Sequence, residues 1–300
     1  MLLVRYRVPQ LPEAGAGVLR DDGRVCPLRY GSIAEMLRHP VPEIRAAVEG
    51  AAAGPPVDDD VVFLPPVDGR MEVWASGVTY RRSREARMEE SETADVYWRV
   101  YTAERPELFF KSVAWKVVGD GDPIGIREDS SLNVPEAELA VVANAYGEPV
   151  GYTICDDVSS RSIEGANPLY LPQAKVYAGA CAVFDGIRPA WEIPSAARLD
   201  IHCVVRRDGA VAWEAATDTG ELTRTPASLL SWLYRQDVFP DGVVLSTGTG
   251  LVPDLAFTLR PGDSVAITIG QIGTLTNTVR VGVEPFRATR PDPIGADVLP

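Results

Sequence analysis

The chain has 300 residues, of which 46% are hydrophobic and 24% are charged, and its formal net charge is −13 at pH 7. This length and composition are typical of a globular protein with one large domain, or with one large and one small domain. The acidic balance disfavours nucleic acid as a partner, because an acidic surface repels phosphate backbones. The acidic net charge does not exclude an anionic small-molecule ligand, provided that a cation or arginines lie in the binding pocket.

The cysteines and the N-terminus indicate the cellular compartment. The four cysteines are Cys26, Cys155, Cys181 and Cys203, and no two of them form a C-x-x-C pair. We therefore predict reduced, buried thiols in a cytoplasmic protein rather than a zinc ribbon or a redox dithiol. The start, "MLLVRYRVPQ", lacks the apolar core of a signal peptide, and no run approaches the roughly 18 apolar residues of a membrane span, so we expect no membrane partner.

The first 66 residues predict a small N-terminal α+β domain with its linker. A short apolar strand, "LLVRYRV", is followed by a helical patch, "IAEMLRHPVPEIRAAVEG". The next stretch, "AAAGPPVDDD", is rich in Ala, Gly, Pro and Asp and is the strongest linker candidate. Residues 67–300 are then expected to form the catalytic domain.

The larger domain begins with "EVWASGVTY" and a charged segment, "RRSREARMEESETADVYWRVYTAERPE", whose Glu/Arg spacings suit an exposed helix. Within the remainder, Asp208-Gly209 predicts a tight hairpin, and Thr225 with Pro226 predicts a capped helix start. Strands without regular helical alternation indicate an α+β, mainly β fold and argue against a Rossmann domain. The predicted strands are "LFFKSV", "IGIRE", "AELAVVANAYGEPVGYTICDD", "KVYAGACAVFD", "LDIHCVVRRDGAVAWEA", "GVVLSTGTG" and "DSVAITIGQIGTLTNTVRV".

Paired carboxylates carry the first chemical signal. Glu136 and Glu138 are two residues apart on a predicted strand, so their side chains share one face. The turn "GEP" would pair this strand with "GYTICDD", and either Asp156 or Asp157 would then lie beside the glutamates. Three carboxylates without a neighbouring His or Cys suit Mg²⁺, Mn²⁺ or Ca²⁺ rather than zinc. A solvated acidic strand face is the alternative, because E-x-E pairs are common.

Two further stretches allow a chemical or an ordinary interpretation. Lys175 stands in the apolar run "LYLPQAKVYAGACAVF". Its amine either reaches solvent or lies in a pocket as a base or an amine nucleophile. The segment "LSTGTG", residues 245–250, offers hydroxyls and open backbone N–H groups that could bind a carboxylate, or it is a tight turn.

The order and spacing of "PEAELAVV", "GYTICDDVSSRS", "QAKVYAG" and "LSTGTG" resemble the fumarylacetoacetate hydrolase superfamily over roughly residues 70 to 280. The strings "VWASGVTY", "RPELFFK" and "NPLYLPQAKVYAG" resemble its branch of 2-keto-3-deoxy-arabinonate dehydratases. The resemblance implies a mixed β-roll or sandwich, a homodimer or homotetramer, and Mg²⁺, with Mn²⁺ or Ca²⁺ as alternatives. It also implies dehydration of a 2-keto-3-deoxy sugar acid to 2,5-dioxopentanoate.

The resemblance assigns roles to particular residues. It implies that Glu136, Glu138 and Asp157 bind the metal and that Lys175 acts as a base or as a Schiff-base nucleophile. Glu107 is expected as a further acid or base. The residues expected to contact substrate are Ser76, Tyr80, Arg84 and Thr249.

One departure from the superfamily bears on the reaction. Many of its hydrolases and decarboxylases carry a histidine after the "TY" stretch, whereas "RRSREARMEE" has none, and the chain has only His39 and His202. We interpret His202 as a packed strand residue. Elimination is therefore favoured over a C–C bond hydrolase, a decarboxylase or an enol–keto isomerase acting on a 2-keto acid. A non-catalytic metabolite-binding protein is a third hypothesis, and the substrate's C4 stereochemistry stays open.

Overall fold

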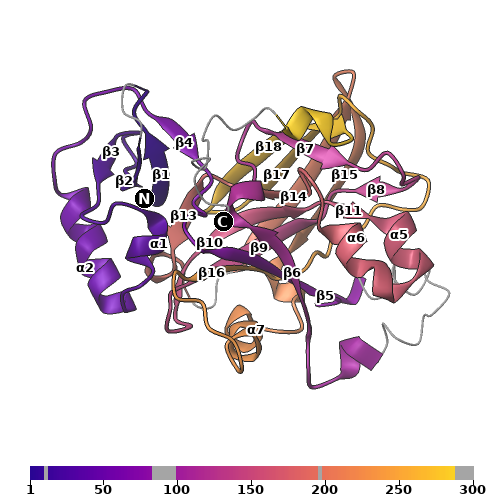
Figure 1. The fold of residues 1–300 in the computed structure, drawn as a ribbon, viewed down its shortest axis with the longest axis horizontal. Helices are drawn as coiled ribbons and strands as arrows, with labels where there is room; N and C mark the ends of the chain where they lie inside the picture. Colours follow the sequence, from indigo (N-terminus) through magenta and orange to yellow (C-terminus); the bar gives the residue numbers. More distant parts are fainter. Residues whose placement is uncertain (10–12, 83–98, 195–197, 288–300) are drawn as a thin grey trace, which may run out of the picture.

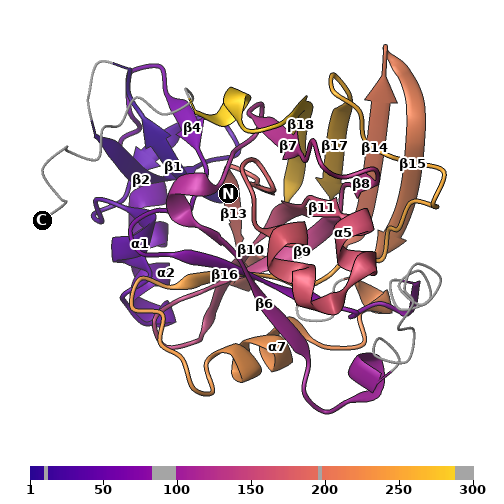
Figure 2. The same ribbon diagram turned by 45° about the vertical axis from the view of Figure 1, so that its right-hand side comes forward.

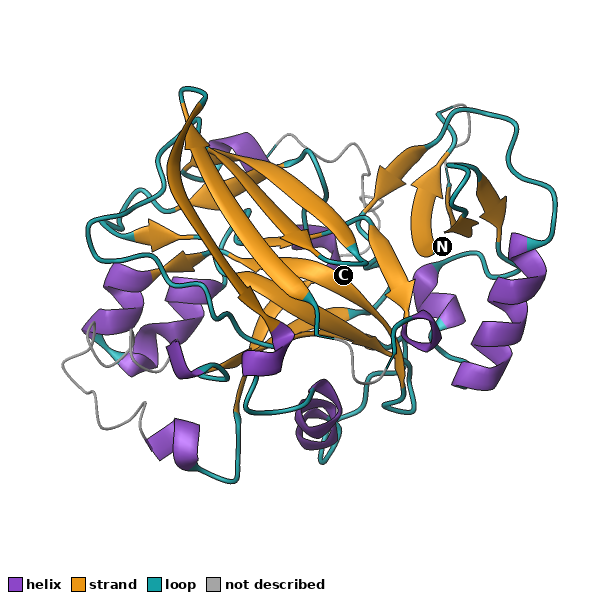
Figure 3. Ribbon diagram, turned by 180° about the vertical axis from the view of Figure 1, so that it is seen from behind, coloured by secondary structure: helices purple, strands orange, loops and turns teal. Residues whose placement is uncertain are grey.

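The described residues of the computed structural model are 1–9, 13–82, 99–194 and 198–287. They form a mainly β fold built on one mixed sheet of eleven strands, a second sheet of five strands and a two-stranded ribbon. Strands fill the middle of the molecule and helices lie around its edge (Figure 3). The prediction of an α+β, mainly β fold is confirmed.

The elements keep one numbering in the text and figures. The eleven-stranded sheet contains β1 (Leu2–Arg7), β2 (Ala14–Leu19), β3 (Val25–Pro27), β4 (Val62–Leu64), β5 (Glu72–Gly77), β6 (Glu107–Val113), β9 (Ala137–Ala143), β10 (Pro149–Asp157), β12 (Cys181–Val183), β13 (Gly186–Pro189) and β16 (Val243–Ser246). The five-stranded sheet contains β7 (Pro123–Ile126), β14 (Asp200–Arg207), β15 (Ala210–Asp218), β17 (Ser264–Ile269) and β18 (Gly273–Val281). The ribbon pairs β8 (Asn133–Val134) with β11 (Ser159–Ser160).

Helices are few and short in the described chain. The α-helices with described bounds are α1 (Ile33–Met36), α2 (Val41–Ala52), α5 (Arg161–Ala166), α6 (Leu171–Lys175) and α7 (Pro226–Leu233). The 3₁₀ turns are η1 (Ala114–Lys116), η2 (Pro168–Tyr170), η3 (Ala190–Glu192), η4 (Thr219–Glu221) and η5 (Glu284–Phe286). No helix of the described residues is long and apolar enough to cross a membrane.

The N-terminal segment shares its sheet with the rest of the chain. Strand β1 pairs antiparallel with β13, with Leu3 opposite Ile187. The N-terminal strands and α2 lie on one side of the molecule, and α5 and α6 lie on the other (Figure 1). The domain division at residue 66 stays a prediction, and the main sheet runs continuously across it.

Strand β9 is the centre of the core. All seven of its residues are buried, because neighbouring strands pair with both of its edges and apolar side chains cover both of its faces. Val142 belongs to the core beneath α2, while Val141 packs with Leu229 and Leu233 of α7. Burying each such valine or leucine stabilises the fold by about 1.5–3 kcal/mol. This two-sided burial explains why the sequence of β9 does not alternate between apolar and polar residues.

Local predictions are confirmed where the backbone geometry is set by neighbouring residues. Asp208 and Gly209 have φ angles of 51° and 82°, and they join β14 to β15 as a two-residue turn. The Thr225 side chain accepts a hydrogen bond from the Ser228 N–H at the start of α7.

One predicted strand differs from the structure. Within residues 175–185 only Cys181–Val183 is a strand, and Lys175 is instead the last residue of α6. Pro172 in the first turn favours the helix, and Gly179, with φ of 73°, redirects the backbone before β12 begins. The side chain of Lys175 is therefore placed by a helix.

Candidate active site

Three carboxylates meet where β9 and β10 run side by side. The two strands pair antiparallel with Glu138 opposite Cys155, as the "GEP" turn predicts. One carboxylate oxygen from each of Glu136, Glu138 and Asp157 lies within 4.8 Å of the others, and all three residues are buried. Asp156 takes a different position, where its Oδ1 accepts a hydrogen bond from the Glu136 N–H at 3.0 Å. As predicted, one of the two neighbouring aspartates joins the glutamates.

Glu138 is held by the strand next to β9. Ser246 Oγ and the Gly248 N–H donate to Glu138 Oε2 at 2.5 and 2.7 Å. The "LSTGTG" segment thus directs an N–H toward a carboxylate of the protein itself. Burial, together with the charges of Asp157 and Glu136, raises the pKa of Glu138 well above its usual range. Such a group gains strongly from a cation nearby.

Lys175 points into this cluster rather than to solvent. Its Nζ donates to Glu136 Oε2 at 2.8 Å, to Asp157 Oδ2 at 3.0 Å and to Ser159 Oγ at 2.5 Å. The residue is only 2% exposed. Of the two interpretations open from the sequence, the pocket position is the one that the structure shows.

Two buried cations that the sequence did not single out complete the cluster. Lys111 of β6 forms an ion pair with Asp157 and donates to the Lys175 carbonyl at 2.7 Å. Arg161 Nη2, at the start of α5, lies 3.2 Å from Glu136 Oε1. Lys111, Arg161 and Lys175 therefore pair with Glu136 and Asp157, which limits the cost of burying these two charges. The signal for Lys111 was a lysine within the apolar strand "LFFKSV".

A pocket opens over the three carboxylates. Helices α5 and α6 pack against each other and against the β8–β11 ribbon beside it (Figure 2). The described residues of its wall include the predicted Ser76, Glu107 and Thr249, together with Phe109, Arg161, Glu164 and Lys175. Ser76 Oγ donates to the Glu107 carbonyl at 3.0 Å. A side chain in place of Gly77 would collide with the Glu107 carboxylate, so this glycine allows Glu107 its position.

The two remaining predicted substrate contacts are Tyr80 and Arg84. Tyr80 is 1% exposed, and it is not among the described residues that line the pocket. Burial is the main cause that raises the pKa of Tyr80. Arg84 lies outside the described residues.

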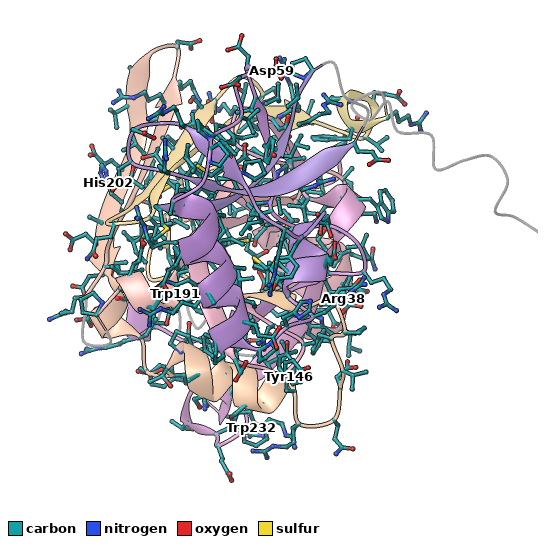
Figure 4. The ribbon with its side chains drawn as sticks, turned by 90° about the vertical axis from the view of Figure 1, so that its left-hand side faces the viewer. Arg38, Asp59, Tyr146, Trp191, His202 and Trp232 are labelled. Carbon is teal, nitrogen blue, oxygen red and sulfur yellow. The ribbon has the colours of Figure 1, made fainter. Side chains whose placement is uncertain are left out.

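Both histidines lie away from the pocket. His202 is at the edge of the molecule (Figure 4), and its Nε2 lies 2.7 Å from Glu214 Oε1. Its side chain is 43% exposed, so the interpretation of His202 as a packed residue is wrong. His39 Nδ1 lies 3.2 Å from Glu43 Oε2 on an exposed surface. Among the described residues of the pocket wall there is no histidine.

Comparisons with known proteins agree with this arrangement. The family profile described as fumarylacetoacetate (FAA) hydrolase C-terminal matches residues 72–280. A probable 2-keto-3-deoxyxylonate dehydratase of Haloferax volcanii is 46% identical over 243 residues, which are 78% of this chain and 83% of the relative. The 2-dehydro-3-deoxy-D-arabinonate dehydratase of Saccharolobus solfataricus is 42% identical over 226 residues, covering 74% of this chain and 76% of that protein.

A solved structure gives the same result for the fold. It is 2-keto-3-deoxy-D-arabinonate dehydratase complexed with magnesium and 2,5-dioxopentanoate, and the match has a TM-score of 0.81 at 34% sequence identity. The match covers 94% of this chain and 99% of the other.

Proposed function

Because the chain belongs to the fumarylacetoacetate hydrolase family, we propose that it is a Mg²⁺-dependent hydro-lyase. Its reaction would convert a 2-dehydro-3-deoxy-pentonate into 2,5-dioxopentanoate and water. The observation that carries the proposal is the contact of a buried lysine amine with two of three converging carboxylates, Glu136 and Asp157. Relatives above 40% identity that are named as dehydratases of such acids support the choice of reaction.

The three carboxylates fit a hard divalent cation. Glu136, Glu138 and Asp157 offer oxygen atoms within 4.8 Å of one another, and oxygen is the ligand that Mg²⁺ prefers. Burial and the charges of Asp157 and Glu136 raise the pKa of Glu138, so a cation held here would stabilise its carboxylate. When bound there, Mg²⁺ would supply Lewis-acid polarisation of the substrate ketone and would favour the uncharged form of the neighbouring amine.

Lys175 is the proposed base. Its Nζ, positioned by Glu136, Asp157 and Ser159, would accept a proton from C3 of the keto acid. The electron pair of the broken C3–H bond forms a C3–C4 double bond as the C4 hydroxyl leaves. Glu107, at the wall of the same pocket, would give that hydroxyl its proton, so that water departs. Further proton shifts from C5 produce the aldehyde.

The neighbouring cations would hold the base and the metal ligands in place. Lys111 ties the Lys175 carbonyl to Asp157, which fixes the end of α6 against the end of β10. Arg161 holds Glu136 from the other side. The site would therefore be preorganised, with little rearrangement needed when substrate binds.

A direct test incubates the pure protein and Mg²⁺ with both C4 epimers of a 2-keto-3-deoxy-pentonate and, separately, with acylpyruvates. We expect 2,5-dioxopentanoate from at least one epimer, identified by mass spectrometry. Lys175→Met should lower kcat by about 10²–10⁴-fold, the usual contribution of a general base. Lys116→Met serves as the control, because Lys116 belongs to the 3₁₀ turn η1 and is not among the described residues of the pocket wall. Cleavage of acylpyruvate without any dehydration would contradict the proposal.

The cellular setting is part of the same proposal. We propose a cytoplasmic enzyme of sugar-acid catabolism that assembles as a homodimer or homotetramer. All four cysteines are buried and none forms a disulfide, which suits a reducing compartment. Light scattering after size-exclusion chromatography would distinguish a dimer from a tetramer.

A further inference from the structure

The pocket over the three carboxylates has one aromatic side chain in a mostly polar wall. The described residues of this wall carry carboxylates, hydroxyls, a guanidinium and an amine, and only Val78 and Phe109 among them have apolar side chains. Phe109 is half-buried. A half-buried ring stabilises the fold less than a fully buried one does, and its open surface is available to a ligand.

Strand β6 directs alternate side chains to the core and to the pocket. Leu108 packs against the apolar cluster that includes α7. Phe110 lies edge-on to Trp74, with the ring centroids 6.0 Å apart. Because side chains alternate along a strand, Glu107 and Phe109 share the opposite face, and both line the pocket. The proposed acid and the phenyl ring therefore lie along one wall.

The ring also lies beside the amine of the proposed base. Nζ of Lys175 is 5.4 Å from the centroid of the Phe109 ring. A carbon that gives its proton to this amine must come within about 3.5 Å of Nζ, and on the ring side of the amine it then packs against the phenyl group. In the proposed reaction this carbon is C3. One of its two substituents is the proton that points at Nζ, and the other lies toward the ring.

A methylene and a hydroxylated carbon differ in such a position. A C–H group packs against a phenyl ring without losing a hydrogen bond, whereas a hydroxyl placed there gives up its bonds to water and finds no strong acceptor in the ring.

We infer that Phe109 is a specificity-determining residue, which makes the site select 2-keto acids with an unsubstituted C3 and reject their 3-hydroxy counterparts. The inference rests on the proposed function, because it takes the keto-acid head to lie at the metal ligands and C3 to lie at Lys175. A contact that penalises the wrong ligand is a common source of specificity.

The test compares pyruvate with 3-hydroxypyruvate, which differ by one hydroxyl at C3. Both carry the keto-acid head, and neither has a C4 hydroxyl to eliminate. Their affinities for the Mg²⁺-loaded protein are measured by isothermal titration calorimetry. The wild-type protein should bind 3-hydroxypyruvate about tenfold more weakly than pyruvate, since a buried hydroxyl without a partner has a cost of this size.

Two substitutions at the same position separate the polarity of the side chain from the presence of the ring. Phe109→Leu keeps an apolar wall and should leave the ratio of the two affinities within about twofold of wild type. Phe109→Gln offers an amide that can donate to or accept from a hydroxyl, so it should bring the two affinities within about twofold of each other.

Leu255→Gln is the matched control for the change in polarity. Leu255 is 60% exposed and is not among the described residues of the pocket wall, so its substitution should leave both affinities unchanged. Far-UV circular dichroism checks that each variant is folded. The wild-type ratio and Phe109→Leu test the inference even if Phe109→Gln does not fold.

Equal affinities of the wild-type protein for the two ligands would overturn the inference, and so would a wild-type ratio in Phe109→Gln. Loss of the discrimination in Phe109→Leu would also overturn it, because the effect would then come from the ring as a support and not from apolar contact. The binding assay needs no turnover, so its result is separate from that of the dehydration assay. A protein that discriminates between the ligands but dehydrates no sugar acid would refute the proposed function alone. A dehydratase that binds both ligands equally would refute the role of Phe109 alone.

Discussion

Lys111 offers the sharpest test of the charge arrangement at the site. Its side chain is almost fully buried, and its Nζ donates to the Lys175 carbonyl at 2.7 Å and to the Val158 carbonyl at 3.1 Å, besides its ion pair with Asp157. Lys111→Met keeps the length of the side chain but removes the charge and every donor. Two carbonyls then lose a partner, and among the described residues Lys175 is the cation that still pairs with Asp157.

Removing one partner of a buried ion pair costs about 3–5 kcal/mol. At about 2–4 °C per kcal/mol for a chain of this size class, Lys111→Met should lower Tm by roughly 10 °C. The measurement is thermal and urea unfolding of the metal-free protein at pH 7, followed by circular dichroism. Lys116→Met is the control, because Lys116 is only half-buried and its Nζ lies over the Trp115 ring rather than beside a carboxylate. A Lys111→Met protein within about 1 kcal/mol of wild type would refute the argument.

Three further predictions concern pH, helix capping and metal. Burial raises the pKa of Asp156 to about 7, so between about pH 4 and 7 the folded state keeps a proton that the unfolded chain has released. The free energy of unfolding should therefore fall as pH rises through this range. Asp156→Asn should make this fall smaller by about a few kcal/mol, measured by urea unfolding of the metal-free protein. The same dependence of unfolding free energy on pH in both proteins would contradict this. Thr225→Ala removes the cap on the Ser228 N–H and should cost about 1 kcal/mol, measured against Ser231→Ala on the same helix. Mg²⁺ at 100 times its Kd should raise the free energy of unfolding of the wild-type protein by about 2.7 kcal/mol. In Glu138→Gln the same Mg²⁺ concentration should give much less stabilisation. Equal stabilisation of both proteins by Mg²⁺ would exclude Glu138 as a ligand.

The local parts of the fold and site could be predicted from the sequence. Glu136 and Glu138 share a face because side chains alternate along a strand, and this holds whatever the strand packs against. The short "GEP" turn brings the end of the next strand beside them for an equally local reason, although it leaves Asp156 and Asp157 as alternatives. Asp208-Gly209 and Thr225 likewise act within a few residues of their own positions.

The tertiary structure alone decided which charges surround the carboxylates. Lys111 comes from β6 and Arg161 from α5, and they meet only after distant strands have paired in register. Lys175 reaches the cluster from a short helix where the pattern of its neighbours predicts a strand. Contacts of this kind depend on the packing of segments far apart in the chain, and residue periodicity carries no record of that packing.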